Sequence, residues 1–245
     1  MSAGIVVAFV VIVLATAVSG LTGFGLAVVG VPPLMLIYEP ATVVVLIAIV
    51  SLFTNAVIVQ DSWREIEVRA VLSLLPWAGL GLLLGTEILR SVNAEYIRLA
   101  VGVIVILAAI LLLRQFELPG IKGRWGTAVA GVTSGALATS TGIAGPPVVL
   151  LFAARRFPKA SFRVSNAAYF LALSVGVISA LLARGIVEFS HLWLSVALVP
   201  AAFAGKMLGT TLVKRLSNKA FRNITLGVVL LTGSLGVLTA AWALL

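Results

Sequence analysis

Long apolar stretches dominate the chain, and short connections between them hold almost all of the charged residues. A membrane-spanning helix needs about 20 mostly apolar residues. Stretches of about this length or longer cover residues 3–37, 41–59, 70–88, 96–113, 126–154, 164–183, 192–212 and 223–244. Six of the eight suit single crossings. The pattern therefore predicts an all-α polytopic membrane protein.

The first and fifth stretches are long for one straight crossing, and both are interrupted. The first contains Ser19-Gly20-Leu21-Thr22-Gly23-Phe24-Gly25 and then Gly30-Val31-Pro32-Pro33, and the fifth contains Thr139-Ser140-Thr141-Gly142 and then Gly145-Pro146-Pro147. Proline removes a backbone donor and disrupts a helix interior, and glycine adds backbone freedom. We therefore predict that each stretch is a hairpin of two short helices.

Composition supports a membrane protein and excludes several other classes. The chain is 61% hydrophobic and 10% charged, with a mean hydropathy of +1.20, whereas soluble domains are about 25% charged. This excludes a soluble enzyme, a disordered protein and a fibrous protein. Cysteine is absent and histidine occurs once, which excludes thiolate and multi-histidine metal sites. The only histidine, His191, and the only aspartate, Asp61, lie in the predicted connections, so we expect no catalytic site and no cofactor.

The net charge of +9 indicates membrane orientation rather than nucleic-acid binding. Apart from Arg90, Arg98 and Arg184, the 17 basic residues fall in four regions, 60–69, 114–124, 155–163 and 206–222. If the fifth stretch enters the membrane and returns, all four regions lie on one side; if it crosses once, they are divided. Basic residues accumulate in cytoplasmic loops. The rule favours the hairpin, with the basic loops cytoplasmic and both termini on the opposite side.

The two halves of the chain resemble each other. The segment from Pro76 to Thr86 matches Pro200 to Thr210 at an offset of 124, and Ser19-Gly20 matches Ser134-Gly135 at an offset of 115. We predict a first repeat over 1–113, a cytoplasmic linker over 114–125 and a second repeat over 126–245. One hairpin and three spans make an odd number of crossings, so the repeats would be inverted.

Inverted repeats with broken helices are typical of secondary transporters, whose substrate site lies at the midplane where the breaks meet. Alternatively, small residues only let helices pack closely. Close packing is our interpretation for Gly81, Gly85, Gly205 and Gly209. We prefer the binding interpretation for the paired hairpins.

An anion suits such a site because the N-termini of half-helices offer free N–H groups and the positive end of the helix dipole. All eight acidic residues lie near segment ends or in connections, and a cation site would need a carboxylate inside a span. The predicted binding residues are Thr22, Gly23, Gly25, Gly30, Pro32, Asn55, Ser140, Thr141, Gly142, Gly145, Pro146 and Asn166.

Alternatives stay open for the polar members of this set. Each hydroxyl either binds substrate or satisfies a backbone carbonyl. Asn55 and Asn166 either line the pathway or join helices by hydrogen bonds. Lys206 lies inside the apolar limit of its segment, where it either attracts anions or, as we prefer, extends its ammonium to the cytoplasmic interface.

The duplicated hairpins and the Gly-x3-Gly-Thr segment late in each half resemble the TauE/SafE sulfite exporter family, also called the toluenesulfonate uptake permease family. The resemblance covers the whole chain. It implies a transporter of sulfite, an organosulfonate or a related small anion, in the plasma membrane of a bacterium, working by alternating access. A carboxylate permease and a non-transporting subunit of a membrane complex are the alternatives, and a homodimer is left open.

Overall fold

The computed structural model describes residues 3–22, 25–114, 123–213 and 234, which form helices and no strands. In the first half the helices are α1 (Ala3–Thr22), α2 (Gly25–Met35), α3 (Pro40–Ser62), η1 (Trp63–Glu65), α4 (Val68–Ser91) and α5 (Ala94–Arg114). In the second half they are α6 (Arg124–Thr141), α7 (Gly145–Ala154), α8 (Lys159–Ala183), α9 (Phe189–Ala197) and α10 (Val199–Val213). The predicted last span, 223–244, lies outside the described residues.

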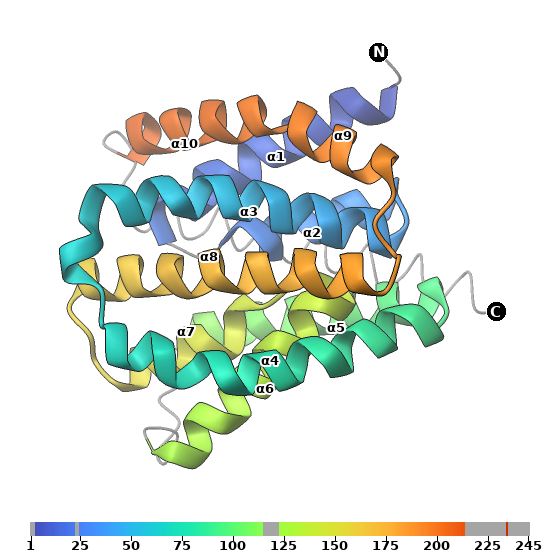
Figure 1. Ribbon diagram of the computed structural model, residues 1–245. Helices are drawn as coiled ribbons and strands as arrows, with labels where there is room; N and C mark the ends of the chain where they lie inside the picture. Colours follow the sequence, from blue (N-terminus) through green and yellow to red (C-terminus); the bar gives the residue numbers. More distant parts are fainter. Residues whose placement is uncertain (1–2, 23–24, 115–122, 214–233, 235–245) are drawn as a thin grey trace.

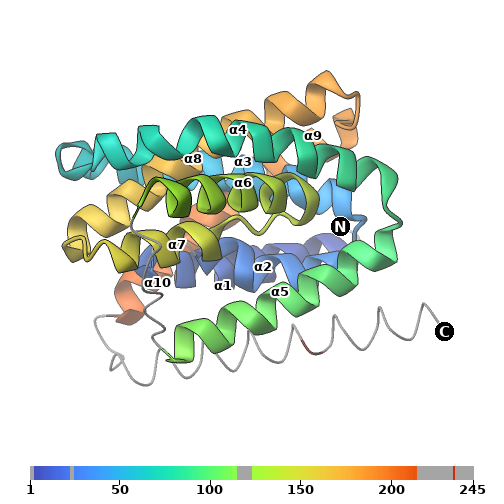
Figure 2. The same ribbon diagram turned by 90° about the horizontal axis from the view of Figure 1, so that it is seen from below.

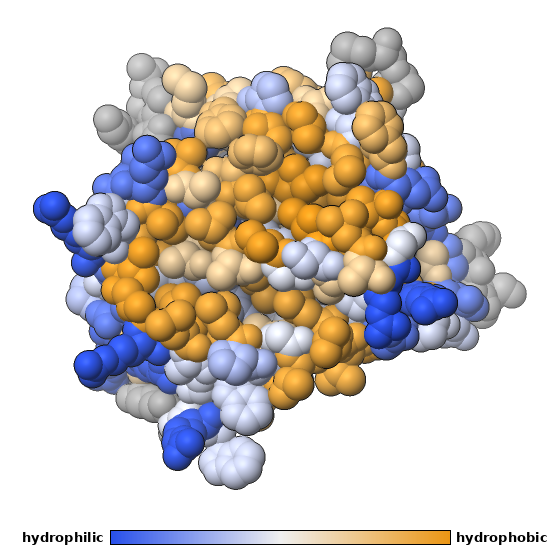
Figure 3. Space-filling model, viewed as in Figure 1, coloured by the Kyte–Doolittle hydropathy of each residue, from blue (hydrophilic) through white to orange (hydrophobic). Residues whose placement is uncertain are grey.

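The all-α membrane prediction is confirmed. The helices Pro40–Glu65, Val68–Ser91, Lys159–Ala183 and Phe189–Leu208 are each long and apolar enough to cross a membrane. A broad apolar band covers the face seen in Figure 3, and charged residues gather at its two ends. Several helices extend beyond the predicted limits, so that Asp61 lies in the last turn of α3 and His191 in the first turn of α9 rather than in connections.

The first long stretch folds back on itself. Helix α1 ends at Thr22 and α2 begins at Gly25. A Cβ atom added to Gly4, near the start of α1, would lie 3.4 Å from Ile37 Cγ2 and 3.5 Å from the Tyr38 hydroxyl, just beyond the end of α2. The two ends of this stretch are therefore neighbours, as a hairpin requires.

The fifth stretch also returns to the end from which it starts. Helix α6 ends at Thr141 and α7 begins at Gly145. Arg155, which follows α7, donates a hydrogen bond from Nη2 to Thr127 Oγ1 in the first turn of α6, with an N–O distance of 2.7 Å. Burial lowers the pKa of the Arg155 guanidinium, which is still protonated at any physiological pH. Both hairpin predictions are confirmed.

Proline occupies different positions in the two hairpins. Pro146 and Pro147 stand at the first positions of α7, where their missing N–H groups leave no intrahelical bond unmade. Pro32 and Pro33 instead lie inside α2, and the helix continues past them to Met35. The expectation that prolines mark the break therefore holds in the second hairpin and is wrong in the first.

The predicted span 192–212 consists of two helical segments. Leu198 separates α9 from α10, and Pro200 follows two residues later. A proline ring has no N–H to donate to the carbonyl four residues earlier and crowds that carbonyl. The chain nevertheless continues in the same helical direction, because the N–H groups of Leu198 and Ala202 are bonded to Leu194 and Leu198 carbonyls.

Each half of the chain packs one of its long helices against the hairpin of the other half. Helix α4 of the first half packs along α6 of the second, and α10 of the second packs along α1 of the first, while α3 and α8 lie side by side between these pairs (Figures 1 and 2). A Cβ at Gly85 would overlap the Ala136 carbonyl oxygen and Thr139 Oγ1, and one at Gly205 would overlap the Val13 carbonyl oxygen and Thr16 Oγ1. The close-packing interpretation is confirmed for Gly81, Gly85 and Gly205, whereas the surroundings of Gly209 lie outside what the structure describes.

The described basic connections meet at one end of the bundle. The Glu67 backbone N–H, after α3, donates to Ser165 Oγ near the start of α8, with an N–O distance of 2.9 Å. At the opposite end, Arg184 after α8 forms an ion pair of 2.6 Å with Glu87 late in α4. The loops 60–69 and 155–163 therefore share a side, as the charge argument predicted.

Candidate anion site between the hairpins

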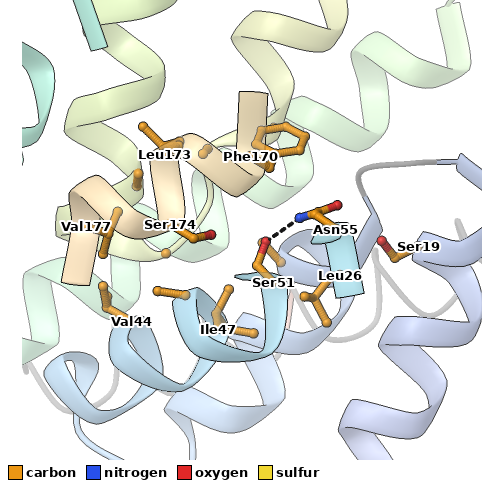
Figure 4. A pocket seen from close by; sticks show the side chains of 16 residues that line it. Ser19, Leu26, Val44, Ile47, Ser51, Asn55, Phe170, Leu173, Ser174 and Val177 are labelled. Carbon is orange, nitrogen blue, oxygen red and sulfur yellow. Dashed lines mark hydrogen bonds between the residues drawn. The ribbon is translucent and has the colours of Figure 1, made fainter. Parts of the chain in front are cut away.

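A cavity of about 50 Å³ lies between the two hairpins. The walls come from α1, α2, α3, α6, α7 and α8. The lining residues are Ser19, Leu26, Ala27, Val44, Ile47, Ala48, Ser51, Asn55, Ala138, Gly142, Ala144, Gly145, Phe170, Leu173, Ser174 and Val177. Residues beside both helix interruptions thus face one space (Figure 4), as the sequence predicted.

Among the described residues that line this cavity, none carries a charged side chain, and the polar ones are uncharged. Asn55 donates from Nδ2 to Ser51 Oγ, with an N–O distance of 2.8 Å. Ser174 lies across from this pair on α8, and Ser19 comes from α1 near the first interruption (Figure 4). Within the described part of the chain, the hydroxyls of Ser19, Ser51 and Ser174 donate to no protein acceptor. They are free to donate to a ligand.

The two half-helices that begin at the cavity differ in the donors they offer. After Gly25, helix α2 continues with Leu26, Ala27 and Val28, all of which carry backbone N–H groups. Helix α7 begins with Gly145, Pro146 and Pro147, so two of its first three residues have none. Both N-termini place the positive end of a helix dipole near the cavity, and α2 supplies more hydrogen-bond donors.

The second interruption has a defined shape. Gly142 adopts the left-handed conformation, with φ of 78°, and its N–H bonds to the Ala138 carbonyl to end α6. Ser134 donates to the Ala144 carbonyl oxygen at 2.8 Å, which ties the turn to the middle of α6. Tyr169 of α8 is fully buried and approaches Ser134. This turn is therefore held by α6 and supported by α8.

The hydroxyls predicted in the last turn of α6 are used within the protein. Thr139 Oγ1 donates to the Leu82 carbonyl at 3.0 Å. Ser140 and Thr141 donate to the carbonyls of the residues four positions earlier, at 2.7 and 2.8 Å. Neither Ser140 nor Thr141 lines the cavity. A role in binding substrate stays a prediction for both residues. Their contacts support the alternative, in which each hydroxyl satisfies a backbone carbonyl.

Of the other predicted binding residues, some line the cavity and others do not. Asn55, Gly142 and Gly145 line the cavity, whereas Gly25, Gly30, Pro32 and Asn166 are buried outside its lining. Gly30 packs between Ala15 and Ile47, and Pro146 faces a separate apolar groove bounded by α5, α6 and α7. Gly23 and the side chain of Thr22 lie outside the described residues.

Ser19, Ser51 and Ser174 were not in the predicted set. The one available signal was helical spacing, because Ser51 stands four residues before Asn55 and therefore shares its face of α3. Ser174 gave no such signal, since only the packing of α3 on α8 brings it opposite Ser51. Ser19 stands at the start of the predicted interrupted segment Ser19–Gly25, but nothing in the sequence separated its hydroxyl from the glycines and Thr22 of the same segment.

Comparison with protein families agrees with this arrangement. The family model described as "Sulfite exporter TauE/SafE" matches residues 8–235, nearly the whole chain. The chain belongs to the sulfite exporter TauE/SafE family. Members of this family are membrane transporters, and the long apolar helices of this chain are those of an integral membrane protein. A search of curated proteins gave no match, and a search of solved structures gave none.

Proposed function

We propose that this TauE/SafE family protein carries a small sulfur oxyanion, with sulfite as the best-fitting substrate, through the cavity between its hairpins. The observation that carries the proposal is the chemistry of the lining. Three serine hydroxyls, one amide and two helix N-termini converge on a space that no carboxylate lines within the described parts of the chain. Such a site offers donors from several directions, which the oxygens of an oxyanion need.

Neutral donors suit a transported anion better than a buried cation would. A full positive charge in the cavity itself, far from either end of the bundle, would be expensive to bury and would hold the anion tightly. Helix N-termini and hydroxyls supply partial positive charge that is already fixed in place. The anion can therefore bind and also leave again.

The cavity is small, with about 50 Å³, and a compact anion is therefore the substrate that we propose. Small carboxylates are the alternative substrate class, and competition between sulfite and acetate separates the two classes.

We propose that the basic loops face the cytoplasm of a bacterial cell and that the substrate is exported by alternating access. A negative interior drives an anion outward with about 2.3 kcal/mol per charge per 100 mV. No coupling ion is required for export in this direction. The same orientation places the start of α1 outside the cytoplasm.

The test is sulfite counterflow in proteoliposomes that contain the purified protein, with unlabelled sulfite, sulfate, sulfoacetate or acetate as competitor. Sulfite should compete best and acetate least. Ser174→Ala should raise the sulfite concentration for half-maximal flux about fivefold or more, as expected when a donor to a charged group is lost.

The matched control is Ser179→Ala, which makes the same change on an exposed face of the same helix. It should leave the half-maximal concentration unchanged. Stronger competition by acetate than by sulfite would favour the carboxylate alternative. Absence of any flux from the purified, folded protein would favour a non-transporting subunit and refute the proposal.

A further inference from the structure

Within the described residues, four buried polar side-chain atoms have no hydrogen-bond partner. They are Arg163 Nε, Asn166 Oδ1, the Tyr169 hydroxyl and Lys206 Nζ. Buried polar atoms in proteins are nearly always paired, and the exceptions need an explanation. Three of the four lie on α8 at intervals of three residues, so the exceptions are concentrated in one region.

Two of these residues share the cavity-facing side of α8. At 3.6 residues per turn, Arg163 and Asn166 lie on the same face as Phe170, Leu173 and Ser174, which line the cavity. They occupy the part of that face between the cavity and the basic end of the bundle. Tyr169 is turned away from this face toward Ser134 of α6.

The amide of Asn166 is fixed in one orientation. Its Nδ2 donates to the Phe162 carbonyl oxygen at 2.9 Å, and the residue is fully buried. Its Oδ1 therefore points elsewhere as a free acceptor. The side chain is held in place by one bond and has an unused polar atom, and it stands three residues after Arg163 on the same face of α8.

Lys206 adds a second cation to this region. It projects from α10, and the charges of Asp61 and Arg163 both act on it. Its ammonium nitrogen is buried within the protein, and its extension to the cytoplasmic interface stays a prediction. In the described chain neither Lys206 nor Arg163 has an ion-pair partner. Two cations beside one carboxylate leave one positive charge that a small anion could balance.

We propose that Lys206, Arg163 and Asn166 form a second, inner anion-binding site that receives a small oxyanion at the basic end and passes it along α8 to the cavity. The two cations hold the oxygens of the anion, and Asn166 Oδ1 accepts a hydrogen bond from a water that the anion retains. This inference rests on the proposed function, because the anion is the transported one.

The test uses sulfite flux in inside-out and right-side-out membrane vesicles, so that sulfite meets one face of the protein at a time. Lys206→Met and Arg163→Gln should each raise the half-maximal sulfite concentration about tenfold, as expected for loss of a charged donor, when sulfite is presented at the basic end. The value measured from the opposite face should not change.

Two further variants separate a local site from general effects. Lys206→Arg keeps a charged donor and should retain most of the affinity at the basic end. Lys159→Met removes an exposed cation from the start of α8, the helix that carries Arg163. It should change the half-maximal concentration less than about twofold, because exposed charges are screened by salt.

Equal changes at both faces, or no change at either, would overturn the inner site while leaving the cavity proposal standing. Because Arg163→Gln and Lys206→Met lie on different helices, failure of one variant to fold leaves the other to decide. If the unchanged protein shows no sulfite flux in either vesicle type, the proposed function fails and this inference fails with it.

Discussion

Replacing Gly81 by alanine should weaken the contact between α4 and α6, where the helices pack without side chains between them. A Cβ at this position would overlap the Val132 carbonyl oxygen and lie 2.8 Å from the Ala136 nitrogen. Carbon atoms normally keep about 3.5 Å or more from such neighbours. All of these atoms are backbone, so the helices must separate, and overpacking of this kind costs about 1–3 kcal/mol.

Gly79 provides the control, because it lies two residues earlier on the same helix and a Cβ there would meet nothing within 4 Å. Gly79→Ala should stabilise the helix by up to about 1 kcal/mol. The two variants should therefore differ by about 1–4 kcal/mol in the free energy of unfolding.

For a chain of 245 residues, each kcal/mol corresponds to roughly 2–4 °C in Tm. We expect Gly81→Ala to unfold several degrees below Gly79→Ala when tryptophan fluorescence is followed during heating in detergent. If Gly81→Ala unfolded at the same temperature as Gly79→Ala or above it, the backbone-to-backbone contact would be refuted.

Two further predictions concern the second hairpin and the topology. Thr141→Val should weaken sulfite counterflow without changing Tm much. Thr141 Oγ1 donates to the Leu137 carbonyl and accepts from the Ile143 N–H, across the turn that borders the cavity. Unchanged counterflow kinetics would count against this role. The chain has no native cysteine, so single cysteines can be labelled without background. Arg156→Cys should react with a non-permeant maleimide only from the cytoplasmic side and Phe189→Cys only from the opposite side, and the reverse result would invert the proposed orientation.

The features that the sequence predicted well depend on local chemistry. Apolar length identifies the helices, and glycine before a proline pair identifies the start of α7. The charge distribution identified the returning hairpin, because only a return places the loops 60–69 and 155–163 on one side. The first two signals lie within a short stretch of chain, whereas the third compares loops that are far apart in the sequence.

The positions predicted less well depend on the register between helices. Alignment of the halves made Gly30 and Pro32 equivalent to Gly145 and Pro147, yet α2 begins at Gly25 and carries Pro32 in its interior. Helix α2 can include these prolines because buried neighbours, rather than intrahelical bonds alone, hold it in place. The interruption of the first hairpin therefore lies several residues before Gly30, the position that the match to Gly145 suggested.

Hydroxyl function could not be assigned from residue type. Thr16 and Thr139 both donate to backbone carbonyls, and both stand beside a glycine of the other half. Ser174 has the same chemistry but faces the cavity. Only the partners of each oxygen separate a packing hydroxyl from one that is free to bind an anion.

The exchanged packing of the halves gives physical support to the predicted inverted repeat, which itself stays a prediction. At Gly85 the neighbours are a carbonyl oxygen and the threonine hydroxyl three residues later on α6, and at Gly205 they are a carbonyl oxygen and the threonine hydroxyl three residues later on α1. The same arrangement thus occurs twice, with the roles of the halves reversed. Each hairpin is held by a span of the opposite half, and so the cavity between the hairpins depends on both halves for its shape.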